Sequence, residues 1–435
     1  MYEDLKGKKL LVIGSTAAEV AIIKAAKELG MYTISVDGIT NRDVTPAKRA
    51  ADEAWDMDYS DTEAVAERCR REGVNGVLAG YSEFRVLAAC RIAKAIGTPF
   101  YATEEQILLT RDKRQFKNAC SRCGVKVPQD FCTAYPLSAE ERAAIRYPVI
   151  VKPADYGGRR GISVCRSEEE LDAAVEYAMR MSVVGKLIVE EFLVGTEFSA
   201  VYTLADGEIS LSCVNEKYTA GDQRTKNQLC ELVITPAYML PRFLKEADGP
   251  IKDFLRSIGA RNGVANFQGM YTENGVYVFE MGYRINGNND YKIVAHHNGV
   301  NFMHMLINYS VNGTMGPGIE KDDPAFDCYY STVVMNLHGG TVTKFNYDRL
   351  REREEIFDLQ FYIREGDRIT EDGTTRQKAG MIKESGRTIR DIQEIFNYTY
   401  DNLIVRDEKG GNMLFRRLDF APIAANHERY SGERA

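Results

Sequence analysis

A lysine followed at once by a glycine-rich loop is the strongest chemical feature of this 435-residue sequence. The apolar run 147–151 leads to Lys152, and the loop behind it carries Gly157, Gly158 and Gly161. Lysine supplies a compact positive charge for phosphate oxygens, and glycines allow successive backbone N–H groups to point at one anion. The pattern predicts a buried strand that delivers a phosphate-binding loop, with a surface turn as the competing interpretation.

A second segment, residues 187–199, combines carboxylates with apolar side chains. An adenine ring requires an apolar slot with a backbone donor and acceptor at its edge, and ribose hydroxyls favour a carboxylate acceptor. Glu190, Phe192 and Leu193 suit the adenine, and Glu197 suits the ribose. The alternative is a hairpin whose acidic side chains are simply solvated.

A third segment, residues 267–288, predicts a metal-binding hairpin. A two-residue turn at its Asn-Gly pair would set Gly269 opposite Glu280, whereas a three-residue loop over 273–275 sets Gln268 opposite Glu280. Opposed side chains share one face with Cβ atoms about 5 Å apart, which suits two oxygen ligands of one or two Mg²⁺ ions. We predict the three-residue loop and the Gln268–Glu280 pair, against the alternative of a merely polar hairpin face.

The elements that must position these segments begin with an alternation of strands and helices. We expect them at residues 9–13, 17–29, 32–36, 62–72, 76–79 and 82–96. This βαβα order is typical of a parallel, doubly wound sheet. The turn after the first strand has Gly14 but lacks the other two glycines of a dinucleotide fingerprint, so we interpret this domain as a scaffold or a wall of the substrate site rather than an NAD site.

Length and composition restrict the class of protein. At 435 residues the chain should form two to four domains, and its net charge of −7 argues against a nucleic-acid surface. The apolar run 10–13 is too short for a signal segment or a membrane span. The close pair Cys120 and Cys123 lacks a second pair or a suitably spaced histidine for a zinc site. We expect a cytoplasmic protein with reduced thiols and no membrane partner.

In this order the three segments resemble the ATP-grasp superfamily, particularly its carboxylate–amine or carboxylate–thiol ligases. The resemblance implies an α/β and α+β fold class: a Rossmann-like pre-ATP-grasp domain over 1–103 and a two-lobed ATP-grasp domain over 104–310 that divides near 185. Residues 311–423 are expected to form a small mixed C-terminal subdomain, and within them residues 375–412 resemble that of biotin-carboxylase-like and L-amino-acid-ligase-like members. Residues 424–435 are expected to be a loose tail.

The same resemblance assigns roles to residues. Lys113 and Lys152 match the two phosphate-binding lysines of the family. The stretch from Glu280 to Arg284 lies where the family usually has Glu-x-Asn-x-Arg, so Gly282 replaces a metal-ligating asparagine, and Asn286 is a candidate substitute. The family's first metal ligand is more often a carboxylate than the amide found here, although the carbamoyl-phosphate-synthetase-like branch shares the amide.

The reaction implied by the resemblance uses ATP with Mg²⁺ or Mn²⁺ to convert a carboxylate into an acyl phosphate, which an amine then attacks. Arg284 would hold the carboxylate and the acyl-phosphate oxygens. Lys217, in a polar stretch of the large lobe, would face phosphate or substrate, with a solvated loop as the alternative. Small-molecule carboxylates and amines are the expected partners, amino-acid or peptide types first, and a homodimer is possible.

Two other functions stay open at this stage. A regulatory nucleotide-binding protein of the same fold would bind ATP without substrate-dependent ADP release. A Rossmann oxidoreductase would bind NADH. A biotin carboxylase is less attractive because no histidine-rich bicarbonate signature is present, and His296 and His297 are expected to line a helix.

Overall fold

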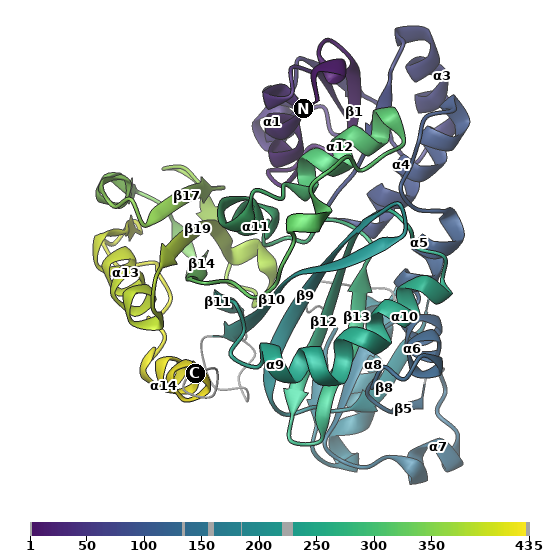
Figure 1. Ribbon diagram of the computed structural model, residues 1–435. Helices are drawn as coiled ribbons and strands as arrows, with labels where there is room; N and C mark the ends of the chain where they lie inside the picture. The colour runs from purple at the N-terminus through teal and green to yellow at the C-terminus, as the bar shows by residue number, and fades with distance from the viewer. Residues whose placement is uncertain (1, 133–134, 155–160, 184, 220–228, 432–435) are drawn as a thin grey trace.

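The computed structural model describes residues 2–132, 135–154, 161–183, 185–219 and 229–431. Its N-terminal part is the expected parallel sheet, with strand order β3-β2-β1-β4 (Figure 1). The strands are β1 (Lys9–Ile13), β2 (Tyr32–Asp37), β3 (Glu53–Asp56) and β4 (Gly76–Leu78), and the main helices are α1 (Glu19–Glu28), α3 (Thr62–Glu72) and α4 (Glu83–Ile96). The order changes direction between β1 and β4, and the carboxyl ends of strands at such a point commonly border a ligand site.

A small antiparallel sheet forms the second part, in the order β5-β8-β6-β7. Its strands are β5 (Asp130–Cys132), β6 (Val149–Pro153), β7 (Ser163–Cys165) and β8 (Leu187–Glu191), and α8 (Leu171–Met181) covers it. Because β8 is a central strand here, the lobe boundary falls after Glu191 and the predicted division near 185 is wrong. Helices α5 (Glu104–Arg111) and α6 (Lys113–Arg122) pack instead against the large sheet described next.

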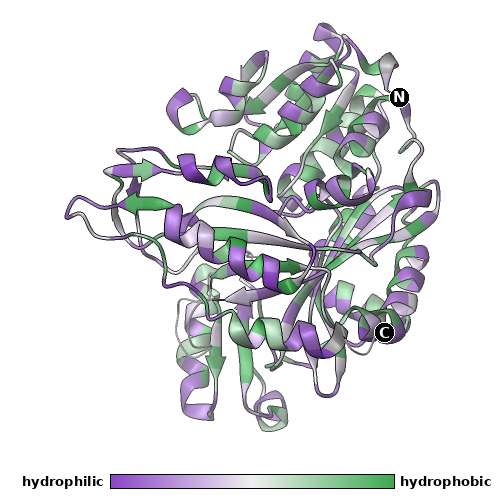
Figure 2. Cartoon of the chain, turned by 60° about the vertical axis from the view of Figure 1, so that its left-hand side comes forward, coloured by the Kyte–Doolittle hydropathy of each residue, from purple (hydrophilic) through white to green (hydrophobic). Residues whose placement is uncertain are grey.

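The third part is an eight-stranded sheet in the order β13-β12-β9-β10-β11-β14-β19-β17 (Figure 1). The strands are β9 (Thr196–Ala205), β10 (Glu208–Thr219), β11 (Cys230–Thr235), β12 (Gly263–Thr272), β13 (Gly275–Gly282), β14 (Tyr329–Asn336), β17 (Ile356–Phe361) and β19 (Lys378–Gly386). Strand β14 pairs with β11, so the sheet continues across the predicted boundary at 310. Apolar residues gather on its strands (Figure 2), and a second core, which includes Leu232 and Val333, lies under its C-terminal half.

The C-terminal end differs from the expected loose tail. Residues 421–431 form helix α14 (Ala421–Ser431), which packs against α13 (Ile389–Asn402). Ala424 is fully buried, and His427 is 1% exposed between the rings of Tyr238 and Tyr329. The prediction failed because a polar composition conceals these inward-facing contacts.

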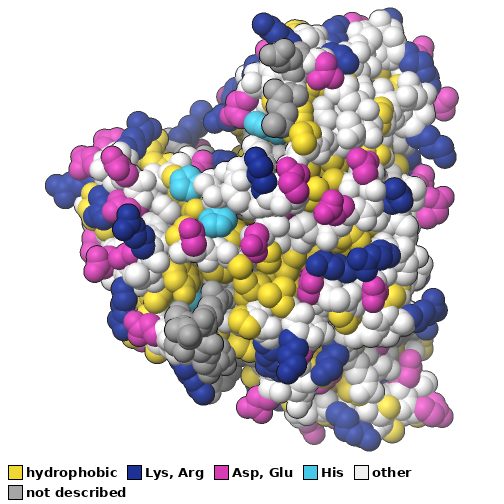
Figure 3. Space-filling view, viewed as in Figure 1, with side chains coloured by type: hydrophobic (Ala, Val, Ile, Leu, Met, Phe, Trp, Pro, Cys, Tyr) yellow, Lys and Arg dark blue, Asp and Glu magenta, His cyan; other side chains and the backbone are white. Residues whose placement is uncertain are grey.

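Charged side chains of both signs are visible on the surface (Figure 3). Basic and acidic side chains are interspersed on the face shown in Figure 3, without a large field of one sign. Within the described ranges, no helix is both long and apolar enough to cross a bilayer.

Candidate active site

A buried network of charges joins the small sheet to α6. Lys152 on β6 contacts one carboxylate oxygen of Glu190 on β8, and Lys117 on α6 donates to the other oxygen at 2.7 Å. Lys117 also contacts Asp130 on β5. Burial alone would raise the pKa of Glu190, but the charges of Lys152 and Lys117 outweigh it and hold that pKa below its usual value. The Glu190 carboxylate therefore faces the lysines, and only its backbone remains for an adenine edge.

Lys117 is a residue that the sequence analysis missed. It lies four positions after Lys113, and residues at that spacing occupy one face of a helix. Its side chain is 3% exposed. The sequence feature that could have identified Lys117 is its spacing from Lys113, which places a second lysine on the same face of α6. Its acidic partner is distant in the sequence.

Lys113 brings the small sheet and the hairpin into one site. Asp112 caps α6 by accepting the backbone N–H groups of Arg114 and Gln115, each at 3.0 Å, so Lys113 begins the helix. Burial lowers the pKa of Lys113, the Glu280 carboxylate opposes that change, and the Lys152 ammonium adds to it. Lys113 is thus close enough to both Lys152 and Glu280 for their charges to act on it.

The β12–β13 hairpin confirms the predicted pair but not the predicted loop. Gln268 is opposite Glu280, as expected. The loop, however, has two residues, because Thr272 pairs with Gly275, and a bulge at Phe279 restores the Gln268–Glu280 pairing. Such a bulge adds one residue to one strand and redirects the side chains beyond it.

Glu280 and Gln268 have the donor chemistry of a magnesium site. Glu280 is half-buried, and none of the described residues forms a hydrogen bond or ion pair with its carboxylate. Gln268 Oε1 accepts one hydrogen bond, from Lys217 Nζ at 3.2 Å, which leaves its second lone pair. One carboxylate and one amide suit Mg²⁺ that takes its remaining ligands from water and phosphate.

Lys217 is not a solvated loop lysine. It lies on β10 opposite Glu197 of β9 and donates to Glu197 Oε1 at 3.0 Å. Burial would lower the pKa of Lys217, but the carboxylates of Glu197 and, to a lesser extent, Glu280 raise it. Lys217 therefore stays charged beside Gln268.

Arg284 contacts the N-terminal domain at the point where its strand order reverses. Its Nε and Nη2 donate to Glu83 Oε1 at 2.7 and 2.6 Å, and Glu83 begins α4 directly after β4. A Cβ at Gly282 would lie 3.3 Å from Arg284 Cζ. Gly282, which departs from the family pattern, therefore leaves room for the guanidinium.

Asn286, the predicted substitute metal ligand, forms hydrogen bonds with neighbouring residues through both ends of its amide. Its amide nitrogen donates to Asn266 Oδ1 at 3.3 Å and contacts Asp290, while its oxygen accepts the Asp290 backbone N–H at 3.3 Å. Both ends of the amide thus hold the loop that follows Arg284. This position could not be judged from the sequence, because the loop folds back on itself.

A hydrogen-bonded chain that the sequence analysis also missed links three parts of the molecule beside Arg284. Tyr81 donates to Asn289 Oδ1 at 2.8 Å, and Asn289 donates to Gln360 Oε1 at 3.0 Å. Tyr81 and Asn289 have φ values of 67° and 55°, in the left-handed region that non-glycine residues rarely adopt. Such strain persists where surrounding contacts impose it, and it is frequent at functional sites.

Three of the remaining predicted residues, Gly161, Phe192 and Leu193, lie in the described part of the chain. Gly157 and Gly158 fall outside the described residues, whereas Gly161 is buried with φ 75°, and a Cβ there would come within 2.6 Å of Pro153 Cγ. The Phe192 backbone N–H donates to the Pro148 carbonyl at 3.3 Å. Leu193, the next residue, is half-buried.

The turn at Gly14 is filled by protein. A Cβ at Gly14 would lie 2.8 Å from Arg85 Nε, and Arg85 is paired with the fully buried Glu19 at 2.8 Å. A dinucleotide site needs open backbone at this turn for a pyrophosphate. In this structure the Arg85 side chain occupies that space.

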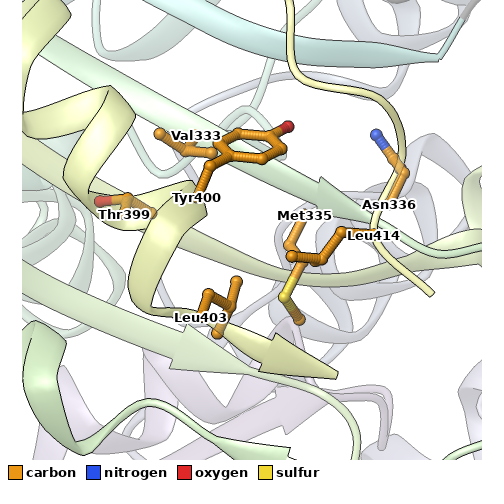
Figure 4. Close-up of a pocket in the computed structure, with 7 residues that line it drawn as sticks. All are labelled: Val333, Met335, Asn336, Thr399, Tyr400, Leu403 and Leu414. Carbon is orange, nitrogen blue, oxygen red and sulfur yellow. The ribbon is translucent and has the colours of Figure 1, made fainter. Parts of the chain in front are cut away.

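A separate cavity lies in the C-terminal core, between β14 and α13 (Figure 4). Its lining is mostly apolar and includes Val333, Met335 and Leu403. Its volume of about 10 Å³ accommodates no more than one water molecule. It is too small to bind a substrate.

Comparisons with known proteins find relatives in sequence and in fold. A family model described as "D-ala D-ala ligase C-terminus" matches residues 127–223. The chain is 27% identical over 278 residues to the formate-dependent phosphoribosylglycinamide formyltransferase of Wolinella succinogenes, over 63% of this chain and 69% of that protein.

Two solved structures share the fold over almost the whole chain. The L-amino acid ligase from Bacillus licheniformis has a TM-score of 0.75 at 18% identity and covers 93% of this chain and 99% of its own. The biotin carboxylase domain of the Hydrogenobacter thermophilus 2-oxoglutarate carboxylase, solved with MgADP and bicarbonate, has a TM-score of 0.74 at 18% identity and covers 94% and 91%. At this identity the likeness is one of fold.

Proposed function

The chain belongs to the ATP-grasp superfamily of carboxylate–amine ligases, and from this premise we propose that it uses MgATP to convert a small carboxylate into an acyl phosphate for attack by an amine. The observation that carries the proposal is the approach of Lys113 to both Lys152 and Glu280. Two basic groups and one acidic hairpin around a single space match a triphosphate with its magnesium ion.

Three lysines would share the triphosphate. Lys113 and Lys152 approach it from the α6 and β6 side, and Lys217 approaches from β10 beside Gln268. The ion pair with Glu190 holds the Lys152 side chain in position before nucleotide arrives. Lysine ammonium groups neutralise the charge that develops on phosphoryl oxygens, which is the main requirement of phosphoryl transfer.

Glu280 and Gln268 would hold the magnesium ion. When bound, Mg²⁺ neutralises the phosphate oxygens and orients them for transfer. Because the Gln268 amide carries no charge, Glu280 supplies the full negative charge of the protein's contribution, and the nucleotide phosphates supply the rest. Glu280 is therefore the residue on which metal affinity should depend most.

Arg284 would bind the carboxylate that receives the phosphoryl group. In the structure its guanidinium is paired with Glu83, so an incoming carboxylate must share or displace that partner. The planar fork of an arginine binds two carboxylate oxygens at once and retains its charge throughout the reaction. The same contact would then stabilise the acyl-phosphate oxygens.

The first step of the reaction requires no general base on the protein, because the attacking carboxylate carries no proton. A carboxylate oxygen attacks the γ-phosphorus as the bond to the β-phosphate oxygen breaks and ADP leaves. The amine nitrogen then attacks the acyl carbon, phosphate leaves, and the nitrogen loses a proton. Amino-acid or peptide-type carboxylates and amines are the first substrates to screen. We further propose that the protein acts as a homodimer in the cytoplasm.

An ADP-release screen across carboxylate–amine pairs tests the proposal. The expected result is ADP release that requires both partners, or the carboxylate alone if hydrolysis of the acyl phosphate competes. Arg284→Ala should keep ATP binding and lose carboxylate-dependent ADP release. ATP binding without ADP release for any pair would favour a regulatory protein, and unchanged turnover in Arg284→Ala would remove Arg284 from the mechanism.

A further inference from the structure

Three side chains with metal-ligating atoms meet on the surface at the end of α11 (Tyr291–Asn298), outside the proposed nucleotide site. His297 lies in the last turn of α11, and Asp327 and Cys328 directly precede β14. His297 Nδ1 is 3.6 Å from Asp327 Oδ1 and 3.9 Å from Cys328 Sγ. All three ligand atoms lie within 4.8 Å of one another.

These separations are close to those around a tetrahedral zinc ion. Bonds of about 2.0–2.1 Å to nitrogen and oxygen and about 2.3 Å to sulfur set the nitrogen and oxygen ligands about 3.4 Å apart, and the nitrogen and sulfur about 3.6 Å apart. The observed 3.6 and 3.9 Å exceed these values by only a few tenths of an ångström. The Asp327 side chain is 90% exposed, so its carboxylate can rotate to close the remaining gap.

The histidine is oriented before any ion binds. Its ring stacks on Phe326, with centroids 4.0 Å apart and planes 11° apart, and Tyr330 meets it edge-on at 6.1 Å. The His297 side chain is 14% exposed. Rings fixed in this way lose little freedom on ligation, which favours metal binding.

The local charge also favours a cation. The carbonyl groups at the C-terminal end of α11 carry partial negative charge, and Asp327 adds a full negative charge.

We propose that His297, Asp327 and Cys328 form a zinc site with three protein ligands, whose fourth position takes water or an external donor. Imidazole and thiolate ligands select Zn²⁺ over Mg²⁺, so this site is distinct in chemistry from that of the nucleotide. The ion would fasten the end of α11 to the start of β14, the strand that joins the C-terminal half of the large sheet to β11. The sequence alone did not reveal the site, because its histidine and cysteine are 31 residues apart.

The test is a titration of the reduced, nucleotide-free full chain with Co²⁺ as a spectroscopic probe, followed by competition with Zn²⁺. The expected result is about one equivalent of Co²⁺ with a thiolate charge-transfer band and tetrahedral visible absorption, all displaced by Zn²⁺ and not by excess Mg²⁺. Because no ATP is present, the outcome is independent of the proposed ligase activity.

Variants separate this site from adventitious binding to the nine cysteines of the chain. Cys328→Ser should abolish the charge-transfer band, and His297→Ala should weaken binding at least tenfold. Asp327→Asn should keep the band with weaker binding. Cys123→Ser is the matched control, because Cys123 is a half-buried cysteine at the end of α6, where it contacts Ser257. This variant should bind Co²⁺ as the parent does. A band that survives Cys328→Ser, or the absence of stoichiometric binding in the parent, would overturn the proposal.

Discussion

Replacing Lys117 with methionine tests whether the buried charge network positions Lys152, the lysine that we propose binds phosphate. Methionine keeps most of the side-chain volume and removes only the charge. The change leaves Asp130 without Lys117 and leaves Glu190 with Lys152 as its only lysine partner. Two positive and two negative charges thereby become one positive and two negative charges in a largely buried region.

The size of the effect follows from burial. Removing one partner from a buried ion pair typically costs about 3–5 kcal/mol. Glu190 is 5% exposed, but Asp130 is 22% exposed, so water can partly solvate the acid that is left without its lysine. We therefore expect the lower end, a loss of about 3 kcal/mol in the free energy of unfolding. ATP binding should weaken about tenfold, or about 1.4 kcal/mol, because Glu190 then neutralises more of the Lys152 charge.

Urea unfolding and ATP titration measure the two effects. Arg114→Met, at an exposed position on the same helix, is the control and should change the free energy of unfolding by no more than about 0.5 kcal/mol. Adding Asp130→Asn to Lys117→Met should restore part of the lost stability, because it removes the acid left without a partner. A Lys117→Met protein that unfolds and binds ATP like the control would refute the reasoning.

Two further predictions concern buried groups elsewhere. Glu231 is fully buried, and burial raises its pKa from 4.5 to about 8. Between these pH values the folded protein keeps a proton that the unfolded chain has lost, so stability falls as pH rises, by at most ~1.4 kcal/mol per pH unit. Glu231→Gln should make this slope shallower in urea unfolding from about pH 5 to about pH 8 and leave the contribution of the buried Glu384, whose pKa is raised to about 7. The exposed Glu208→Gln should keep the parent slope. Tyr81→Phe removes the hydroxyl bonded to Asn289 and should lower the free energy of unfolding by about 1 kcal/mol; unchanged thermal and urea midpoints would show that this bond contributes nothing.

Local signals made the N-terminal elements predictable. Helix α3 has the predicted bounds because Asp61 caps its first turn and Gly73 ends it in the left-handed conformation. Lys152 and its glycine-rich loop were recognisable for the same reason: strand, charge and glycines are adjacent in the chain. By contrast, β3 was missed because Glu53–Asp56 is short, and only Trp55 within it is fully buried.

Long-range contacts account for what the sequence did not reveal. The loop length of the β12–β13 hairpin depends on the bulge at Phe279, and nearby a Cβ at Gly269 would lie 2.3 Å from Phe198 on the neighbouring strand. Rules that relate a turn's sequence to its length predict neither the bulge nor this close contact. The Arg284–Glu83 pair likewise joins residues 201 positions apart, so the partner of Arg284 is known only once the chain has folded.

The central claim is that Lys152 and Glu280 serve one triphosphate. The most direct measurement is ATP affinity by calorimetry, with and without Mg²⁺, for the parent, Lys152→Met and Glu280→Gln. We predict that Lys152→Met weakens binding in both conditions, whereas Glu280→Gln removes most of the enhancement that Mg²⁺ gives. Parent-like MgATP binding by both variants would contradict the account, because the two groups would then not face a shared nucleotide.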